Sequence, residues 1–240
     1  MGTSGVEFAI AKSIANEDVQ LILIRRNKEQ AESAIKQINS NRNISYMLGD
    51  ISSKIGLQSV LTEIKEKINH IEVLIDCAGV YPKSRQINID INLRSHYFLD
   101  HALKNLLSNA EHPSIAIVTG MPKPIQKMPI WELQFNITLR GMWELTHKTL
   151  LVKLLAKELK VNNINVNAFF PGDVQSNLMK HSKTVKNTEV PVSYLALNPN
   201  MDNMNGKFID NYGHIVPLSN GKYNTDIAKH RLSKYLMTEV

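Results

Sequence analysis

The chain has 240 residues, 43% of them hydrophobic and 21% charged, which is the composition of an ordinary soluble globular protein. One cysteine and no cluster of Cys and His exclude a disulfide framework and argue against a metal site. The 28 Lys and Arg outnumber the 22 Asp and Glu, giving a net charge of +6, but the two signs are interspersed, so we expect no nucleic-acid partner.

No apolar run approaches the ~18–20 residues of a membrane span, and the N-terminus lacks the pattern of a signal peptide. We therefore expect no membrane span and an intracellular location, with the cytoplasm favoured and an organelle left open.

Short apolar runs alternate with longer amphipathic stretches over most of the chain. The runs are rich in Ile, Val and Leu, as buried strands are, and they occupy residues 18–24, 44–48, 71–77, 114–119 and 164–170. Between them, apolar residues at helical spacing predict helices over residues 7–15, 29–38, 55–68, 92–107 and 140–159. Alternating strands and helices imply parallel pairing through right-handed crossovers, so we predict an α/β fold with a doubly wound parallel sheet.

The alternation ends at Pro171. Residues 172–206 are polar and rich in Asn, which is typical of turns and loops. A last amphipathic helix is predicted over residues 225–238. Because no repeat or linker divides the sequence, we expect a single domain over residues 1–240.

Several of the strand-to-helix turns carry motifs of one family. Residues 1–15 (MGTSGVEFAIAKSIA) resemble the nucleotide-binding turn of the short-chain dehydrogenase/reductase superfamily, whose pattern is Thr-Gly-x-x-x-Gly-x-Gly at the start of a helix. Further motifs follow in the family's order: LIRRN (23–27), GDIS (49–52), DCAGV (76–80), INL (91–93) and FFPGDVQS (169–176). Residues 206–219 and the last helix resemble the retinol-dehydrogenase-like branch. The resemblance implies a Rossmann-like fold in which residues 172–206 form the substrate loop.

The resemblance also implies a cofactor site at the first turn. Gly5 matches the family's middle glycine, which lets backbone amides meet a pyrophosphate at a helix N-terminus, but Glu7 occupies the third glycine position. Arg25 and Arg26 follow about twenty residues later, where an arginine accommodates the 2′-phosphate of NADP. We expect NADP(H) if a dinucleotide binds, with weak or lost binding left open. The alternative for both arginines is a solvated strand end.

The remaining cofactor contacts that the resemblance implies lie at later turns. They are Asp50 and Ile51 at the adenine, Cys77, Ala78 and Gly79 at the ribose, and Pro171, Gly172 and Ser176 at the carboxamide end. Asp50 has an alternative role as a cap of the helix that begins near Ser52.

The family's catalytic residues are largely missing. In the family, a tyrosine exchanges a proton with the substrate oxygen, a lysine four residues later lowers its pKa, and a serine orients the substrate. None of the seven tyrosines here has a lysine four residues on. Counting back from LAKEL (155–159) places Gly141 and Leu145 at the tyrosine and lysine positions, and Gly120 falls at the serine. Only the family's asparagine, Asn92, is retained, as a vestige of the proton relay.

A substitute acid on the predicted helix from Arg140 to Leu159 is the alternative. His147 and Lys148 lie on this helix, and a shift of one turn would bring Glu144 and Lys148 to the tyrosine and lysine positions. The same helix has an apolar surface broader than contact with one sheet requires. It resembles the family's helix that packs against a partner subunit, so we expect a homodimer or a hetero-complex through it.

By the same resemblance, the sheet lacks its first strand. Met1 falls at the family's first glycine, so the strand that should precede it, at the centre of the sheet, is not in the sequence. Three alternatives follow: the sequence is truncated, the strand at 18–24 pairs directly with the strand at 71–77, or a partner donates a strand.

Two functions remain. The first is a degenerate short-chain dehydrogenase/reductase, inactive in Tyr/Lys hydride transfer, that serves as a binding or structural subunit. The second is an NADP(H)-dependent oxidoreductase that acts on a lipophilic carbonyl or alcohol with a non-standard proton donor, and whose turnover depends on His147 or Lys148. Hydrolase and metal-enzyme motifs such as Gly-x-Ser-x-Gly and His-Glu-x-x-His are absent. We favour the first.

Overall fold

The computed structural model describes residues 5–38, 43–172, 174 and 204–237 of the chain. Its strands are β1 (Leu21–Arg25), β2 (Ile44–Leu48), β3 (Val73–Asp76), β4 (Ser114–Val118), β5 (Asn165–Phe169) and β6 (Phe208–Ile209). Its helices are α1 (Val6–Ile14), α2 (Lys28–Ile38), α3 (Lys54–Lys67), α4 (Arg85–Ile89), α5 (Ser95–Leu107), α6 (Pro122–Lys127), α7 (Ile137–Glu158) and α9 (Thr225–Leu236).

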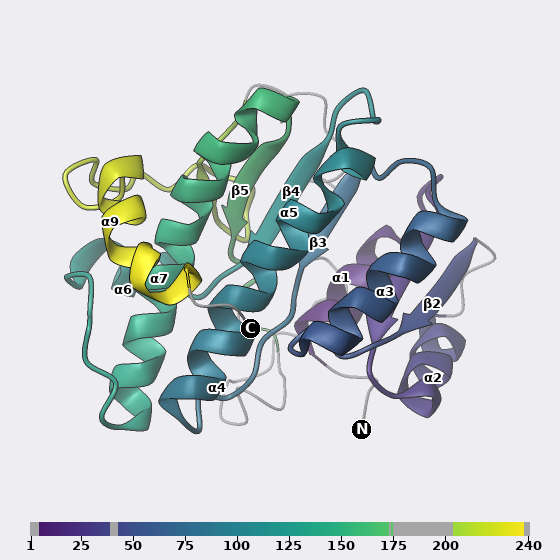
Figure 1. The fold of residues 1–240 in the computed structure, drawn as a ribbon, viewed down its shortest axis with the longest axis horizontal. Helices are drawn as coiled ribbons and strands as arrows, with labels where there is room; N and C mark the ends of the chain where they lie inside the picture. The colour runs from purple at the N-terminus through teal and green to yellow at the C-terminus, as the bar shows by residue number, and fades with distance from the viewer. Residues whose placement is uncertain (1–4, 39–42, 173, 175–203, 238–240) are drawn as a thin grey trace.

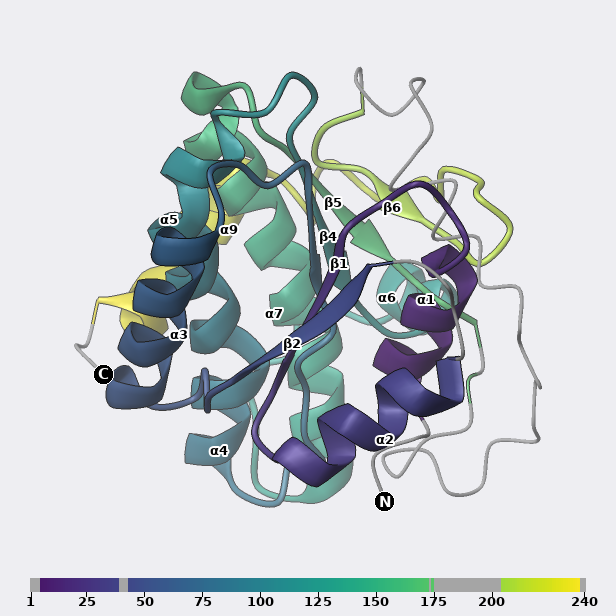
Figure 2. The ribbon, with the colours of Figure 1, turned by 90° about the vertical axis from the view of Figure 1, so that its right-hand side faces the viewer.

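All the strands pair in parallel, as predicted. Neighbouring strands are β1–β2 in one sheet and β3–β4–β5–β6 in the other. Helices α3, α5 and α7 cover one side of these strands, and α1 and α2 cover the other (Figure 1, Figure 2). The predicted α/β fold with a doubly wound parallel arrangement is therefore confirmed.

The strands divide into two sheets because no hydrogen-bonded ladder joins β1 to β3. Within the described residues, β1 pairs only with β2, and β3 pairs with β4 but not with β1. Direct pairing of these two strands, one of the three alternatives, is therefore not the arrangement formed. Instead, Leu21 of β1 and Ile75 of β3 contact one apolar cluster that also holds Ile10 and Ile14 of α1. Side-chain contacts, rather than a backbone ladder, connect the two sheets here.

The predicted helix over residues 92–107 begins earlier than expected. It is formed by α4, a π-helical turn η1 (Asp90–Arg94) and α5. Single π-helical turns of this kind are frequent at functional sites. Asn92 lies in this turn, and its amide makes hydrogen bonds to Val80, outside the helix.

Helix α7 is covered from within the chain on most of its surface. Trp143, Leu150 and Leu151 are fully buried, and Trp143 Nε1 donates a hydrogen bond to the Tyr235 hydroxyl of α9 at 3.2 Å. Helix α9 lies along α7 (Figure 1) and places the buried Leu232 in the same core. Its packing accounts for part of the broad apolar surface without a second subunit. No helix among the described residues is both long and apolar enough to cross a membrane.

The carboxylate of Glu132 fastens α9 to the segment before α7. It accepts hydrogen bonds from Arg231 and Lys234, both at 2.8 Å, and from the Tyr235 hydroxyl at 3.2 Å. His147 Nε2 lies 3.6 Å from the carboxylate, beyond hydrogen-bond length. The His147 ring first, and then Lys234 and Arg231, lower the pKa of Glu132 against the burial that raises it.

We expect Glu132→Gln to destabilise the protein at pH 7 by about 1–2 kcal/mol. The substitution removes the negative charge that pairs with Arg231 and Lys234 of α9. A lowered carboxyl pKa contributes stability above the unfolded pKa of ~4.3, and this contribution is lost as the pH falls. The difference between wild type and variant should therefore shrink below pH 4. Urea denaturation at several pH values measures it, with the exposed Glu66→Gln as control. A difference that persists unchanged at pH 3 would contradict this assignment.

Candidate functional site

The carboxyl ends of the strands meet the N-terminus of α1, and a carboxylate occupies this position. Gly5 precedes α1 with φ 117°, a backbone conformation that favours glycine. Glu7, in the first turn of α1, pairs with Arg25 at the end of β1 through two contacts of 3.1 Å each. Partial burial raises the pKa of Glu7, and Arg25 opposes this rise. Arg25 is thus engaged by a carboxylate of its own chain.

Arg26 and Asp50 lie at the ends of the neighbouring strands. The Arg26 side chain is 64% exposed and lies 4.0 Å from Asp50, so it is available to a ligand. Asp50 accepts hydrogen bonds from the backbone N–H and the hydroxyl of Ser52. Although burial raises the pKa of Asp50, these bonds and Arg26 lower it. The Asp50 carboxylate thus binds Ser52, just before α3. The N-cap of α3 itself is Ser53, whose side chain accepts from Gly56 N. Ile51 contacts the main core.

The turn after β3 is held by Asn92. Its Oδ1 accepts from Val80 N at 2.9 Å, and its Nδ2 donates to Val80 O at 3.0 Å and to Asn88 Oδ1 at 2.9 Å. Asn92 thereby fixes the backbone that follows Cys77, Ala78 and Gly79. These contacts engage both the oxygen and the nitrogen of the Asn92 amide, so the amide positions the turn.

Helix α7 brings Lys148 to the same turn. Lys148 is buried, and its Nζ donates to Ala78 O at 3.4 Å. Burial lowers the pKa of Lys148. Burial raises the pKa of Glu144, one turn earlier, and Lys148 opposes that rise. His147 lies elsewhere, stacked on Trp143 at 4.2 Å, so the structure brings Lys148 to the site and places His147 in the core next to α9.

The three positions that residue counting assigns to the family's serine, tyrosine and lysine, Gly120, Gly141 and Leu145, carry no titratable side chain. A Cβ added to Gly120 would clash with Leu145 Cδ2, so Leu145 fills the space next to Gly120. A Cβ on Gly141 would meet no atom within 4 Å. No group at these three positions can donate or accept a proton.

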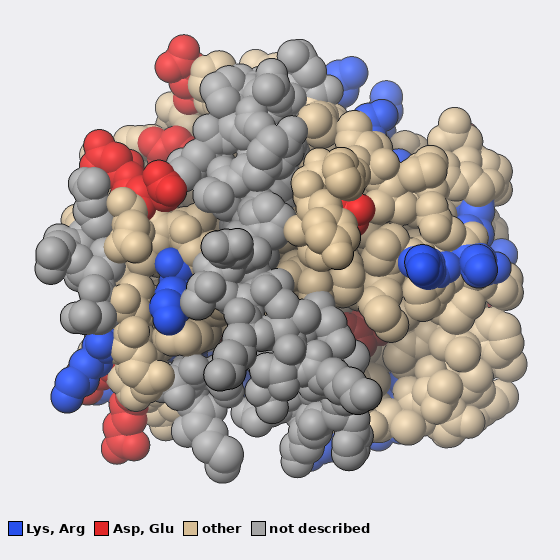
Figure 3. All heavy atoms as spheres, turned by 180° about the vertical axis from the view of Figure 1, so that it is seen from behind, with Lys and Arg blue, Asp and Glu red and all other residues tan. Residues whose placement is uncertain are grey.

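The turn that follows β5 contains two of the predicted cofactor-binding residues within its described part. Pro171 is buried and Gly172 adopts φ 91°, both directly after β5. Residue 173 and the segment 175–203 of the predicted substrate loop lie outside the described residues (grey in Figure 3), and this segment includes the predicted Ser176. The described residues contain no cluster of His, Cys, Asp and Glu able to hold a metal ion.

A buried cluster of charged residues behind the β3 turn was not predicted from the sequence. Asp76, the last residue of β3, forms a hydrogen bond of 3.0 Å with His96 Nδ1, and both residues are buried. Asp100, one turn after His96 on α5, is fully buried and neither carboxyl oxygen has a donor. Burial first, and then Asp76, raise the pKa of Asp100 well above its usual range. The sequence signal was a pair of polar residues, His96 and Asp100, at i and i+4 among apolar neighbours.

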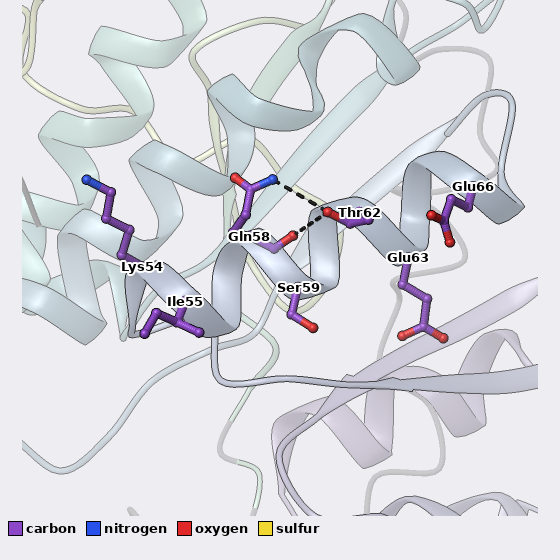
Figure 4. Close-up of a pocket in the computed structure, with 7 residues that line it drawn as sticks. All are labelled: Lys54, Ile55, Gln58, Ser59, Thr62, Glu63 and Glu66. Atoms are coloured by element: carbon purple, nitrogen blue, oxygen red, sulfur yellow. Dashed lines mark hydrogen bonds between the residues drawn. The ribbon is translucent and has the colours of Figure 1, made fainter.

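A surface hollow on α3 lies apart from these residues. It is lined by seven residues of that one helix, among them Ile55, Gln58 and Thr62 (Figure 4). Gln58 and Thr62 are joined by hydrogen bonds along the helix. Because a single exposed helix face forms it and no strand end contributes, this hollow gives no reason to move the candidate site.

The parallel strands and the turns that follow them define a Rossmann-like α/β protein. The short chain dehydrogenase family model matches residues 2–121, which is half of the chain, and the chain belongs to this family. The expected family is therefore confirmed.

The relatives agree with this assignment. Human retinol dehydrogenase 11 is 24% identical over 197 residues, covering 76% of this chain and 62% of that protein. Carbonyl reductase family member 4 of Xenopus laevis is 26% identical over 193 residues, covering 76% of each. The chain thus spans less than two thirds of the human retinol dehydrogenase that it matches. Mouse and bovine retinol dehydrogenases are also among the relatives, which supports the predicted retinol-dehydrogenase-like branch.

Solved structures show the same fold. The Pseudomonas aeruginosa RhlG/NADP active-site complex superposes with a TM-score of 0.69 at 19% identity, over 87% of this chain and 91% of that one. The L-sorbose reductase of Gluconobacter frateurii, solved with NADPH and L-sorbose, also gives a TM-score of 0.69, at 15% identity. At these identities the likeness establishes the fold alone.

The described residues do not fit a pyrophosphate at the first turn without a change. Glu7 lies in the first turn of α1, the helix whose N-terminal backbone amides would meet the phosphates. Its carboxylate forms an ion pair with Arg25. Two negative groups at one helix N-terminus repel each other, so we assign no chemical step that passes through a bound dinucleotide.

Proposed function

We propose that this chain is a short-chain dehydrogenase that does not carry out the Tyr/Lys hydride-transfer chemistry and serves as a binding or structural subunit. One observation carries the proposal: Leu145 fills the space next to Gly120, while Gly141 has no side chain. A phenol with an ammonium group beside it lowers the cost of moving a proton to a carbonyl oxygen, and no residue at these positions supplies either.

The proposal includes weak binding of NADP(H). Arg26 supports a preference for the 2′-phosphate because its side chain is exposed, whereas Arg25 is engaged by Glu7. The carboxylate of Glu7 opposes the pyrophosphate. If NADP(H) binds, Arg26 and Asp50 would lie at its adenosine end, and the turn held by Asn92 would lie near the ribose.

The subunit role has two supports in the fold. The edges of β1 and β3 that face each other carry no ladder, which suits an extended strand from a partner. A homodimer or hetero-complex through α7 would use its less covered N-terminal part, near Met142 and Leu145, because α9 covers much of the rest.

A titration with NADPH tests the proposal. We expect the melting temperature to rise by less than about 1 °C at millimolar NADPH, since binding near ~10 μM would stabilise the protein by a few kcal/mol and raise it by several degrees. We also expect no oxidation of NADPH above the protein-free rate with retinaldehyde or medium-chain aldehydes. Saturable binding together with turnover would overturn the inactive assignment.

A second candidate function is favoured by Glu144 and Lys148. Burial raises the pKa of the Glu144 carboxyl, the direction that a proton donor needs, and Lys148 lies one turn on, at the β3 turn. These two residues would serve an NADP(H)-dependent oxidoreductase acting on a lipophilic carbonyl or alcohol. Turnover that is lost in Glu144→Gln and Lys148→Met, and retained in His147→Gln, would support this second function.

A further inference from the structure

Two loops at the carboxyl end of the sheet expose large apolar side chains. Tyr81 is 48% exposed and Ile87 is 40% exposed in the segment before and within α4. Leu133 is 47% exposed and Phe135 is 82% exposed in the segment before α7. We call these four residues the apolar rim. Figure 1 places α4 and the N-terminal end of α7 at the same lower end of the molecule.

Buried and partly buried hydrogen bonds connect the two segments. Arg140 Nε donates to Pro82 O at 2.5 Å, and Arg140 Nη1 donates to Gln134 O at 3.2 Å. Asn88 Nδ2 donates to Gln134 Oε1 and to Arg140 O, both at 3.0 Å. Pro82, Asn88 and Gln134 are themselves buried. Each loop is therefore fixed by polar contacts to the other.

These contacts explain why the apolar rim stays exposed. Tyr81 precedes the buried Pro82, and Ile87 precedes the buried Asn88. Leu133 and Phe135 flank the buried Gln134. Turning the apolar side chains inward would pull these neighbours out and break hydrogen bonds between buried groups, which is costly. Exposure of the rim is thus part of the folded structure.

The charge around the apolar rim is positive. Lys83 and Arg85 are exposed between Tyr81 and Ile87, and neither forms an ion pair with the described residues. The nearest carboxylates are already engaged: Asp90 by Arg94 and Gln86, and Glu132 by cations of α9.

We propose that the apolar rim, with Lys83 and Arg85, is a docking surface for anionic phospholipid bilayers. Aromatic and aliphatic side chains next to basic residues are the combination that enters the headgroup region of such a membrane. A positive charge at the rim favours an anionic lipid surface over a neutral one. The carboxyl ends of the strands, and with them the candidate site, then face the membrane. This inference does not depend on whether the site is active.

Vesicle co-sedimentation tests the apolar part. We expect binding to phosphatidylcholine vesicles that contain about a third phosphatidylserine, and little binding to phosphatidylcholine alone. Leu133→Ser with Phe135→Ser should weaken the binding about tenfold or more, because burial of both side chains is lost. The matched control is Ile55→Ser with Val161→Ser, two residues that are each 86% exposed elsewhere, and it should bind like wild type. Unchanged melting temperatures establish that the variants fold.

The charged part has its own test. Lys83→Ala with Arg85→Ala should weaken binding to the anionic vesicles by about fivefold per charge at low salt, and Lys157→Ala with Lys160→Ala should not. Equal binding of wild type to neutral and anionic vesicles would overturn the proposed role of charge. Absence of vesicle binding, or rim variants that bind like wild type, would overturn the docking surface. A dimer that the rim variants dissociate, without vesicle binding, would assign the rim to a second copy and overturn the membrane proposal.

Discussion

Replacing Glu7 with glycine is expected to raise the affinity of the protein for NADPH about tenfold or more, a gain of ~1.4 kcal/mol or more. In wild type, the Glu7 carboxylate lies in the first turn of α1 and pairs with Arg25. A dinucleotide pyrophosphate needs the amides and the positive end of the dipole at this helix N-terminus. Removing the carboxylate removes a repulsion, and it also removes the negative charge that pairs with Arg25. Both changes favour the phosphorylated ligand.

The same substitution should cost stability in the absence of the ligand. Arg25 is only 10% exposed, and without Glu7 it loses its two contacts of 3.1 Å. The first turn of α1 also loses an acidic residue that the helix dipole favours. Together these losses are about 1–2 kcal/mol. A variant that is less stable alone, yet more stabilised by NADPH, separates a local effect on the site from general damage to the fold.

Isothermal titration with NADPH, with NADH alongside it, measures the effect. Glu7→Gln keeps the size of the side chain and removes its charge, so it should give much of the gain; the exposed Glu17→Gln should give none. Arg26→Ala in the Glu7→Gly background should reduce the preference for NADPH over NADH, because Arg26 is the exposed arginine. If Glu7→Gly binds no better than wild type, the carboxylate is not what limits the cofactor.

The order of strands and helices could be predicted because burial on both faces leaves continuous apolar runs. β1 begins within the run at 18–24 and ends one residue after it, and β4 lies within the run at 114–119. β6 could not be predicted, because a strand of two residues carries no periodicity, and α6 is likewise too short for a pattern. The hydrogen bonds of Asn92, within the π-helical turn, go to Val80, twelve residues away, and no local pattern contains them.

The candidate site could be predicted only in part, because side-chain direction depends on position along a helix. His147 and Lys148 are adjacent in sequence, but successive residues of a helix point about 100° apart. Lys148 therefore reaches Ala78 while His147 stacks on Trp143. The engagement of Arg25 by Glu7, across eighteen residues, also required the structure. The assignment of Gly141, Leu145 and Gly120 to the family's tyrosine, lysine and serine positions follows from counting residues and stays a prediction.

Replacing Asp100 with asparagine is expected to stabilise the protein at pH 7 by about 2 kcal/mol, although it alters a fully buried residue. Both carboxyl oxygens of Asp100 lack a donor, and Asp76 is its neighbour. Asp100 can hydrogen-bond to Asp76 only by carrying a proton itself. An asparagine supplies the same donor from its NH₂ group without having to be neutralised.

The pH dependence distinguishes this mechanism from better packing. Burial and Asp76 raise the pKa of Asp100 in the folded protein above the unfolded value of ~3.9. A raised pKa contributes stability that is fully present below the unfolded pKa and is lost as the pH rises towards the folded pKa. Wild type should therefore lose stability between pH 4 and neutral pH through this residue, and Asp100→Asn should not.

Urea denaturation of wild type and Asp100→Asn from pH 4 to pH 8 makes the comparison. The variant should have an advantage at pH 7 and almost none at pH 4. Asp76→Asn provides a comparison variant. It removes the carboxylate that contacts His96 at 3.0 Å, so its change in stability should include the loss of that contact. A variant Asp100→Asn that is less stable than wild type at every pH would mean that Asp100 is ionised in the folded protein.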